Sequence, residues 1–150
     1  MNTDLVGKVL SIAVRPDKRA TLKEIPVANA VADGGIDGDH AVAPTRGITF
    51  ISAKQWNDTL GELGADLPWH TRRANVLIDA PSLGHWIGKT IRVGEVEVEI
   101  LDETRPCQLM DQLHNGLRAA LKPDCRGGVL GRVSKSGSFR VGDTAEVITK

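Results

Sequence analysis

Residues 94–100 read GEVEVEI, and this strict alternation of apolar and acidic side chains decides the fold class. In an extended chain Val96, Val98 and Ile100 face one side, and the three glutamates face the other. A strand with one face on a core and one face in water requires this pattern. The preceding Val93-Gly94-Glu95-Val96 predicts a tight hairpin turn into this strand.

The same period of two recurs along the chain. We expect strands at residues 7–14, 48–51, 75–78, 90–93, 96–101, 129–133, 138–141 and 145–148. Ser136-Gly137 predicts a second hairpin turn near the C-terminus. Many short strands with glycine turns are typical of a mainly β barrel or sandwich. A closed or partly open barrel is the better prediction because closure removes exposed sheet edges.

Two segments depart from the strand pattern and predict short helices. Ser52 can cap a helix whose Trp56, Leu60 and Leu63 fall on one face. The second helix follows Cys107, carries leucines at every fourth residue from 109 to 117, and stops before Pro123.

Length and composition narrow the class of protein. The 150 residues predict one domain, residues 1–150, and 41% hydrophobic content argues against disorder. Nineteen basic and nineteen acidic side chains sum to zero, so we expect no general nucleic-acid or membrane-surface binding. We find no apolar run of membrane-span length and no secretory signal, and two cysteines cannot form a disulfide scaffold. A cytoplasmic protein with reduced thiols is the expectation.

Common catalytic motifs are missing from the sequence. There is no glycine-rich phosphate loop and no G-x-S-x-G elbow. The four histidines are scattered, without metal-ligand spacing between them.

Cys107 is the most informative single residue. It lies in Arg105-Pro106-Cys107-Gln108, directly before the second predicted helix. A helix N-terminus and a neighbouring arginine both favour the thiolate, which is the nucleophilic and metal-binding form. A buried, inert cysteine is the alternative. Cys125, in a glycine-containing loop, could form a redox pair with Cys107, but the spacing fixes no geometry.

Basic residues gather in three places. Arg46 and the Arg72-Arg73 pair precede predicted strands, and residues 118–140 carry six basic side chains against the single acid Asp124. Arginines at strand starts and glycine loops can converge on a phosphate or carboxylate, which their fork geometry binds in a bidentate way. Solvated charge at loop ends is the alternative. The glycine-rich loop 34–40 has two interpretations as well, a tight local turn or the rim of a pocket.

The motifs in their order resemble the MOSC domain, named after the C-terminal domain of molybdenum cofactor sulfurases. The resemblance runs from about residue 7 to residue 148. It rests on residues 35–39, 46–51, 72–78, 87–88, 91–94, 106–107, 127–133 and 137–143.

The resemblance implies a barrel like the one inserted in pyruvate kinase and a bound molybdenum cofactor, whose pterin carries a phosphate. It implies that Cys107 is the molybdenum ligand or a sulfur carrier, roles that suit a thiolate. The expected cofactor-binding residues are Arg46, Arg72, Arg73, Asn75, Arg126, Gly127, Gly128 and Arg132.

Three functions follow as hypotheses. The protein could reduce N-oxygenated substrates with an electron-donor protein, or it could deliver or sulfurate the cofactor for an accepting enzyme. The third is a non-catalytic barrel that serves as an interaction protein. The 150 residues contain no counterpart of the pyridoxal-phosphate-dependent sulfurase domain, so we expect no release of sulfur from cysteine by that chemistry.

Overall fold

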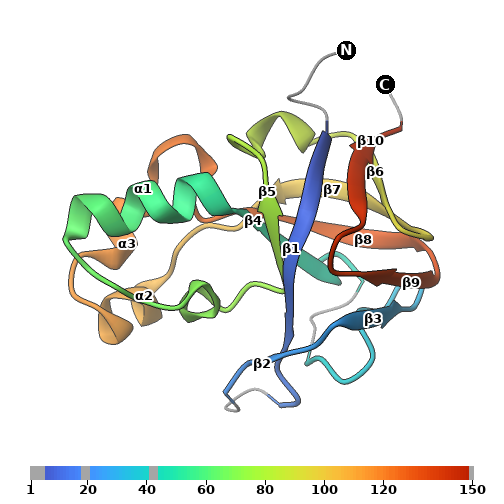
Figure 1. The fold of residues 1–150 in the computed structure, drawn as a ribbon, viewed down its shortest axis with the longest axis horizontal. Helices are drawn as coiled ribbons and strands as arrows, with labels where there is room; N and C mark the ends of the chain where they lie inside the picture. The colour runs from blue at the N-terminus through green and yellow to red at the C-terminus, as the bar shows by residue number, and fades with distance from the viewer. Residues whose placement is uncertain (1–5, 18–20, 41–43, 149–150) are drawn as a thin grey trace.

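The computed structural model describes residues 6–17, 21–40 and 44–148. Seven strands form a closed barrel in the order β1, β10, β6, β7, β8, β4, β5, with β5 pairing back to β1. Their bounds are β1 Val6–Val14, β4 Ile48–Ser52, β5 Val76–Asp79, β6 Thr90–Val93, β7 Val96–Glu103, β8 Val129–Lys135 and β10 Thr144–Val147. The predicted mainly β barrel is therefore confirmed (Figure 1).

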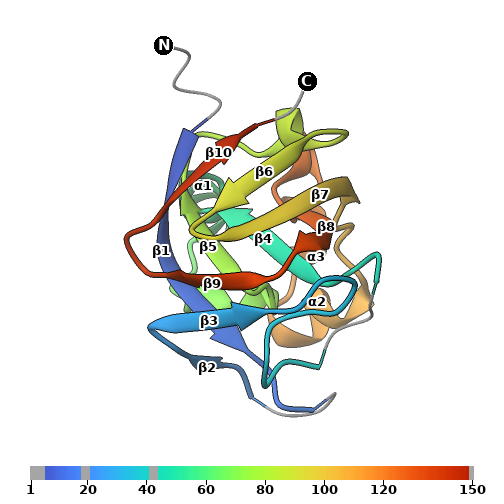
Figure 2. The same cartoon turned by 90° about the vertical axis from the view of Figure 1, so that its right-hand side faces the viewer.

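Two further strands were not predicted. β2, Lys23–Glu24, extends the sheet beyond β1, and β3, Val27–Ala30, forms a separate two-stranded ribbon with β9, Gly137–Arg140. Figure 2 shows this ribbon running across one end of the barrel beside β1. The hairpin predicted at Ser136-Gly137 is wrong, because β9 pairs with β3 and not with β8. β8 already has β7 and β4 on its two sides, so no edge is left for β9.

The interior of the barrel holds the main core. Inward-facing Val96, Val98 and Ile100 of β7 are fully buried, as their alternation predicted, and they meet Phe50 and Trp86 in the same cluster. The Val93–Val96 turn joins β6 to β7 as predicted. Burial of this many large apolar side chains is the main stabilising contribution to the fold.

Three helices cover the outer face of β4 and β5 (Figure 1). They are α1 Ala53–Leu63, α2 Gln108–Leu113 and α3 Leu117–Ala120. Ser52 caps α1 as predicted, because its hydroxyl accepts from Gln55 N at 3.2 Å. A second core lies under the helices, where Trp56, Met110 and Leu117 pack against Ile51.

The single helix predicted after Cys107 is wrong. The chain breaks at Gly116, whose φ of 89° is left-handed, so two short helices form. Leu109 and Leu113 are exposed, and Met110 with Leu117 fills the second core. The every-fourth-residue pattern fails because α2 turns Met110 toward the core, which leaves Leu109 and Leu113 on its exposed side. The described part of the chain also contains 3-10 turns at Trp69–Arg72, Gly84–Trp86 and Pro123–Cys125.

Candidate functional site

A cavity of about 250 Å³ lies outside the barrel, where β1 ends and β4 and β5 begin. It brings together five of the nine residues that the sequence singled out: Arg46, Arg72, Arg73, Asn75 and Cys107. Arg15 joins them.

Strand topology explains why these residues meet. β4 and β5 pair in parallel, with Phe50 opposite Val76, so the two strand starts lie side by side. Arg46 precedes β4, and Arg73 precedes β5. β1 runs antiparallel to β5, so Arg15 follows the end of β1 at the same place. The parallel pairing requires a crossover connection, which α1 supplies.

Side-chain hydrogen bonds of Thr49 and Asn75 fix the starts of β4 and β5, and we call this pair the Thr49–Asn75 lock. Asn75 Oδ1 accepts from the backbone N–H of Thr49 at 3.0 Å and from its hydroxyl at 3.2 Å. In return Thr49 Oγ1 accepts from Asn75 N at 3.0 Å, and Asn75 Nδ2 donates to Ala13 O at 3.1 Å. Both ends of the Asn75 amide are therefore used within the protein, which makes Asn75 a residue that positions the cavity wall.

Arg72 is the least expected feature of the cavity, a buried guanidinium that takes part in no ion pair among the described residues. Its side chain is 4% exposed, and Nε donates to Gly127 O at 3.0 Å while Nη2 donates to Thr104 O at 2.9 Å. Nη1 contacts Met110 Sδ at 3.9 Å. Burial, and then the charge of Arg46, lower the pKa of Arg72 to about 10, while the charge of Cys107 acts in the opposite direction.

Arg73 lies beside Arg72 in a strained backbone conformation. Its φ of 67° is left-handed, and it ends the 3-10 turn that precedes β5. Burial lowers the pKa of its guanidinium, Arg15 lowers it further, and Cys107 raises it. Cys107 is thus an electrostatic neighbour of both guanidinium groups. Backbone strain of this kind is often found at functional sites.

Cys107 stands at the mouth of the cavity, as the residue that caps α2. The helix begins directly after it, as the sequence predicted, and its carbonyl accepts from Met110 N at 3.0 Å. The side chain is exposed and forms no disulfide. The alternative that Cys107 is buried is therefore wrong.

Sequence reasoning did not single out Arg15 as a lining residue, and it included Asp39 and His40 only as part of the loop 34–40. Asp39 Oδ1 accepts from Arg15 N at 2.8 Å, and His40 N donates to Arg15 O at 2.6 Å. The glycine loop 34–40 therefore does form part of a pocket rim, one of its two interpretations. Arg15 was missed because it follows the end of a strand, whereas Arg46 and Arg73 precede one.

The structure does not bring the remaining predicted residues into the cavity lining. Arg132 forms ion pairs with Asp33 and Glu99 on the barrel surface. Arg126 pairs with Glu62 at 2.6 Å. Gly127 contributes its carbonyl to Arg72, and Gly128 packs closely against Phe50.

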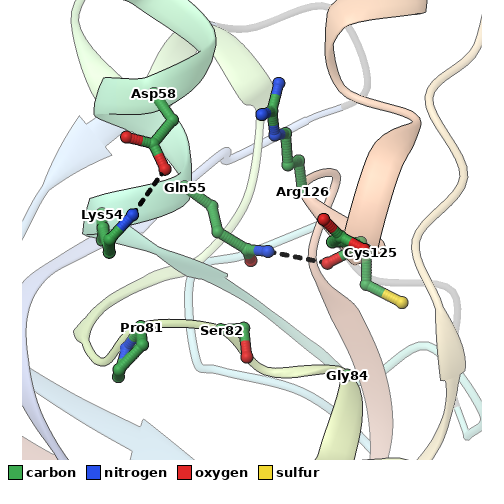
Figure 3. A pocket seen from close by; sticks show the side chains of 9 residues that line it. Lys54, Gln55, Asp58, Pro81, Ser82, Gly84, Cys125 and Arg126 are labelled. Atoms are coloured by element: carbon green, nitrogen blue, oxygen red, sulfur yellow. Dashed lines mark hydrogen bonds and ion pairs between the residues drawn. The ribbon is translucent and has the colours of Figure 1, made fainter.

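Arg126 and Cys125 line a second cavity, of about 420 Å³, beside α1. There Gln55 Nε2 donates to the backbone carbonyl of Asp124 at 2.7 Å, and Lys54 pairs with Asp58 at 2.7 Å (Figure 3). Burial and the charge of Glu103 raise the pKa of the Cys125 thiol. The two cysteines therefore line different cavities, and both are free thiols.

Two features are absent from the described residues. Residues 6–17, 21–40 and 44–148 contain no group of three His, Cys, Asp or Glu side chains arranged to hold a metal ion. None of the helices in these same ranges is long and apolar enough to span a membrane.

The fold and the cavity define a class of protein, a closed β-barrel with a thiol and several arginines at one external pocket. The family model of the MOSC domain matches residues 37–146, and the chain belongs to this family, which is associated with the molybdenum cofactor.

Several solved structures share this fold. The YuaD protein from Bacillus subtilis is 17% identical, with a TM-score of 0.83 and 97% of each chain covered. YiiM from Escherichia coli is 13% identical, with a TM-score of 0.73 over 95% of this chain and 70% of that chain. YiiM from Geobacillus stearothermophilus is 18% identical, with the same TM-score over 95% and 75%. No curated protein sequence matches the chain.

Proposed function

We propose that the protein binds the molybdenum cofactor at the first cavity, with Cys107 as the molybdenum ligand or as a carrier of sulfur. One observation carries the proposal: an exposed thiol shares a cavity with four arginines, one of them buried without a carboxylate partner among the described residues. Thiolates are good ligands for soft metals, and arginines bind phosphate through paired N–H donors.

The residues present fit the two ends of such a cofactor. Cys107 offers an exposed sulfur, and the guanidinium groups of buried Arg72, half-buried Arg73 and exposed Arg46 offer N–H donors in the same cavity. The cavity is slightly smaller than the roughly 300 Å³ at which typical ligand pockets begin. We therefore expect the cavity to hold only the anionic part of the cofactor. When bound, the cofactor would supply a metal that accepts and donates electrons or oxygen.

The protein's own residues have distinct tasks in this proposal. Arg72 and Arg73 hold the anion, and the Thr49–Asn75 lock keeps the two strand starts at fixed separation. Arg126 and Arg132, which the sequence suggested as further contacts, are engaged by acidic residues elsewhere. They are no part of the proposed cofactor site.

The test is cofactor content after expression in a host that makes the cofactor. We expect molybdenum by elemental analysis and pterin fluorescence in the wild type, loss of molybdenum in Cys107→Ser, and retention in Cys125→Ser. The last variant is the matched control, because Cys125 lines the other cavity. A metal-free wild type that also fails to take up added cofactor would contradict the proposal and favour a non-catalytic interaction protein.

If the cofactor is present, a second assay separates enzyme from carrier. Reduction of a hydroxylamine or amidoxime with an artificial electron donor would identify an oxidoreductase that works with an electron-donor protein. No turnover, combined with transfer of the cofactor to an apo-enzyme, would identify a carrier.

A further inference from the structure

One asparagine of the chain is followed directly by a glycine. Asparagine occurs at residues 2, 29, 57, 75 and 115, and only Asn115 precedes a glycine, Gly116. The side chain of Asn115 is exposed, and the residue lies between α2 and α3. Because glycine has no Cβ, its backbone nitrogen is the least hindered one that a preceding side chain can meet. A reaction between side chain and backbone is therefore sterically easiest at this pair.

The structure holds the pair in a tight turn. Leu117 N donates to His114 O at 3.1 Å, which closes a turn with Asn115 and Gly116 at its two central positions. Gly116 has a φ of 89° and a ψ of −8°, the values expected for the third residue of a type II turn. Within the described part of the chain, the Gly116 N–H and the Asn115 amide have no hydrogen-bond partner. No hydrogen bond of their own therefore keeps the two groups from reacting.

The other described asparagines are placed differently. Asn57 is exposed but lies inside α1, and Asn29 lies in β3. Asn75 is buried, and both ends of its amide are bonded within the protein. Each of the three is followed by a residue that carries a side chain and lies in a strand or helix. Sequence and fold therefore both single out Asn115.

We propose that Asn115 is a site of spontaneous deamidation, and that the reaction passes through a cyclic imide formed with the backbone nitrogen of Gly116. The inference is independent of the proposed function, because it uses neither a cysteine nor a cofactor.

The reaction balances with water as its only co-reactant. The Gly116 nitrogen loses its proton to solvent and attacks Asn115 Cγ, so a new C–N bond forms while the bond from Cγ to Nδ2 breaks. The leaving nitrogen takes a proton from solvent and departs as ammonia. Water then opens the imide at either carbonyl. Opening between the nitrogen and Cγ gives aspartate, and opening between the nitrogen and the main-chain carbonyl carbon gives isoaspartate.

Isoaspartate would alter the corner between α2 and α3. It places an extra carbon in the main chain, so the turn closed by His114 and Leu117 loses its geometry. Met110 and Leu117, on the two sides of this turn, are buried in the second core. Met110 Sδ also contacts Arg72 Nη1 at 3.9 Å, which connects this corner to the first cavity. We therefore expect the modified protein to be less stable than the original.

The experiment stores the purified full-length protein in neutral buffer and follows it by peptide mapping with mass spectrometry, together with an assay for released ammonia. We expect aspartate and isoaspartate at residue 115, with residues 29, 57 and 75 unchanged over the same time. Asn115→Gln should stop the reaction, because a longer side chain would have to form a larger ring. Asn57→Gln is the matched control, because this exposed residue lies in α1 and its variant keeps the Asn115-Gly116 pair.

Two further measurements test the part played by the fold. The rate at Asn115 in the folded protein should lie within about tenfold of the rate in guanidinium chloride, because exposed turns open at little free-energy cost. The melting temperature of the stored wild type should fall by about 2–4 °C, the shift that loss of about one hydrogen bond causes in a chain of this size. That of stored Asn115→Gln should not change.

Each result supports or overturns a part of the inference. No conversion at residue 115 in the folded protein, or a rate more than about tenfold below the unfolded rate, would overturn it, because the fold would then protect the pair. Aspartate without isoaspartate would overturn the cyclic route. Conversion with an unchanged melting temperature would leave the modification standing and overturn its effect on the corner between α2 and α3.

Discussion

Arg72 donates from Nε to the backbone carbonyl of Gly127 at 3.0 Å, and this bond ties the start of β5 to the segment that leads into β8. The same guanidinium donates to Thr104 O, so one buried side chain holds three segments that surround the cavity. It therefore has a structural task in addition to the proposed anion binding.

We predict that Arg72→Lys loses about 1–3 kcal/mol of unfolding free energy, because an ammonium cannot reach both carbonyls and one is left buried without a donor. Chemical denaturation measures this loss. Arg92→Lys, on the barrel surface and paired with Glu97, should change stability by less than about 0.5 kcal/mol. Equal losses in the two variants would contradict the role given to Arg72.

Sulfate should stabilise the protein beyond its general salt effect. At a concentration 100 times the dissociation constant, an anion that binds only the folded state adds about 2.7 kcal/mol. We expect the melting temperature to rise more in sulfate than in chloride of equal ionic strength, with a smaller difference in Arg46→Ala. Arg105→Ala should behave like the wild type, which separates cavity binding from general exclusion of sulfate. Identical sulfate responses in all three proteins would count against an anion site here.

Asn75 should be important for stability before any ligand binds. Asn75→Leu leaves Thr49 N and Ala13 O without their side-chain partners in a buried region, so we expect a loss of about 2–4 kcal/mol. Thr49→Val removes the hydroxyl but keeps the backbone donor, and about 1 kcal/mol should be lost. Urea denaturation distinguishes the two. A Thr49→Val loss as large as that of Asn75→Leu would show that the amide is not the centre of the lock.

The two cysteines should differ in their reaction with iodoacetamide. Cys107 is exposed, whereas Cys125 is partly buried and the pKa of its thiol is raised. At pH 7 we expect Cys107 to be alkylated at least about tenfold faster. Because a raised pKa postpones thiolate formation, the rate at Cys125 should still be rising above pH 9. Peptide mapping over time, with each Cys→Ser variant as its control, measures both rates; faster labelling of Cys125 at pH 7 would contradict this assignment.

The sequence allowed much of the barrel to be predicted, because alternation along a strand reports directly on which side faces the core. Thr90–Val93 was predicted to the residue, and the inward face of β7 was correct. β3 could not be predicted, because its short VANA sequence has only two buried alanines to mark a face. The β3–β9 pairing depends on which strand edges the barrel leaves open. These edges are set by contacts between distant parts of the chain, so the residues of β3 and β9 do not reveal them.

The site could be predicted in part, for a related reason. Arg46, Arg72 and Arg73 were expected to converge because each precedes a strand, and parallel pairing of β4 and β5 does bring them together. Arg132 also lies in the basic stretch, but its neighbour across the sheet is Glu99 of β7. A charge count along the chain cannot detect this pairing, because the partner comes from another strand. Arg15 was missed because it follows the end of β1, and only arginines that precede strands were considered.

Gly128 lies directly before β8, and we expect it to tolerate substitution poorly. Its φ is 99°, and a Cβ there would lie far inside van der Waals contact with Phe50 O. Gly142 has almost the same φ, 98°, but a Cβ would meet nothing within 4 Å. Both alanine variants face the left-handed backbone cost of about 1–2 kcal/mol, and only Gly128→Ala also forces β4 and β8 apart.

We therefore expect Gly142→Ala to fold with a modest loss of stability, and Gly128→Ala to lose several kcal/mol more or to fail to accumulate as folded protein. Denaturation curves of both variants, with near-ultraviolet circular dichroism of Trp86 and Trp56 in their two cores, measure the difference. Equal losses would mean that the chain at Gly128 can move away from Phe50 at little cost. Arg72, held by the adjacent Gly127 carbonyl, would then not be fixed in place by this segment.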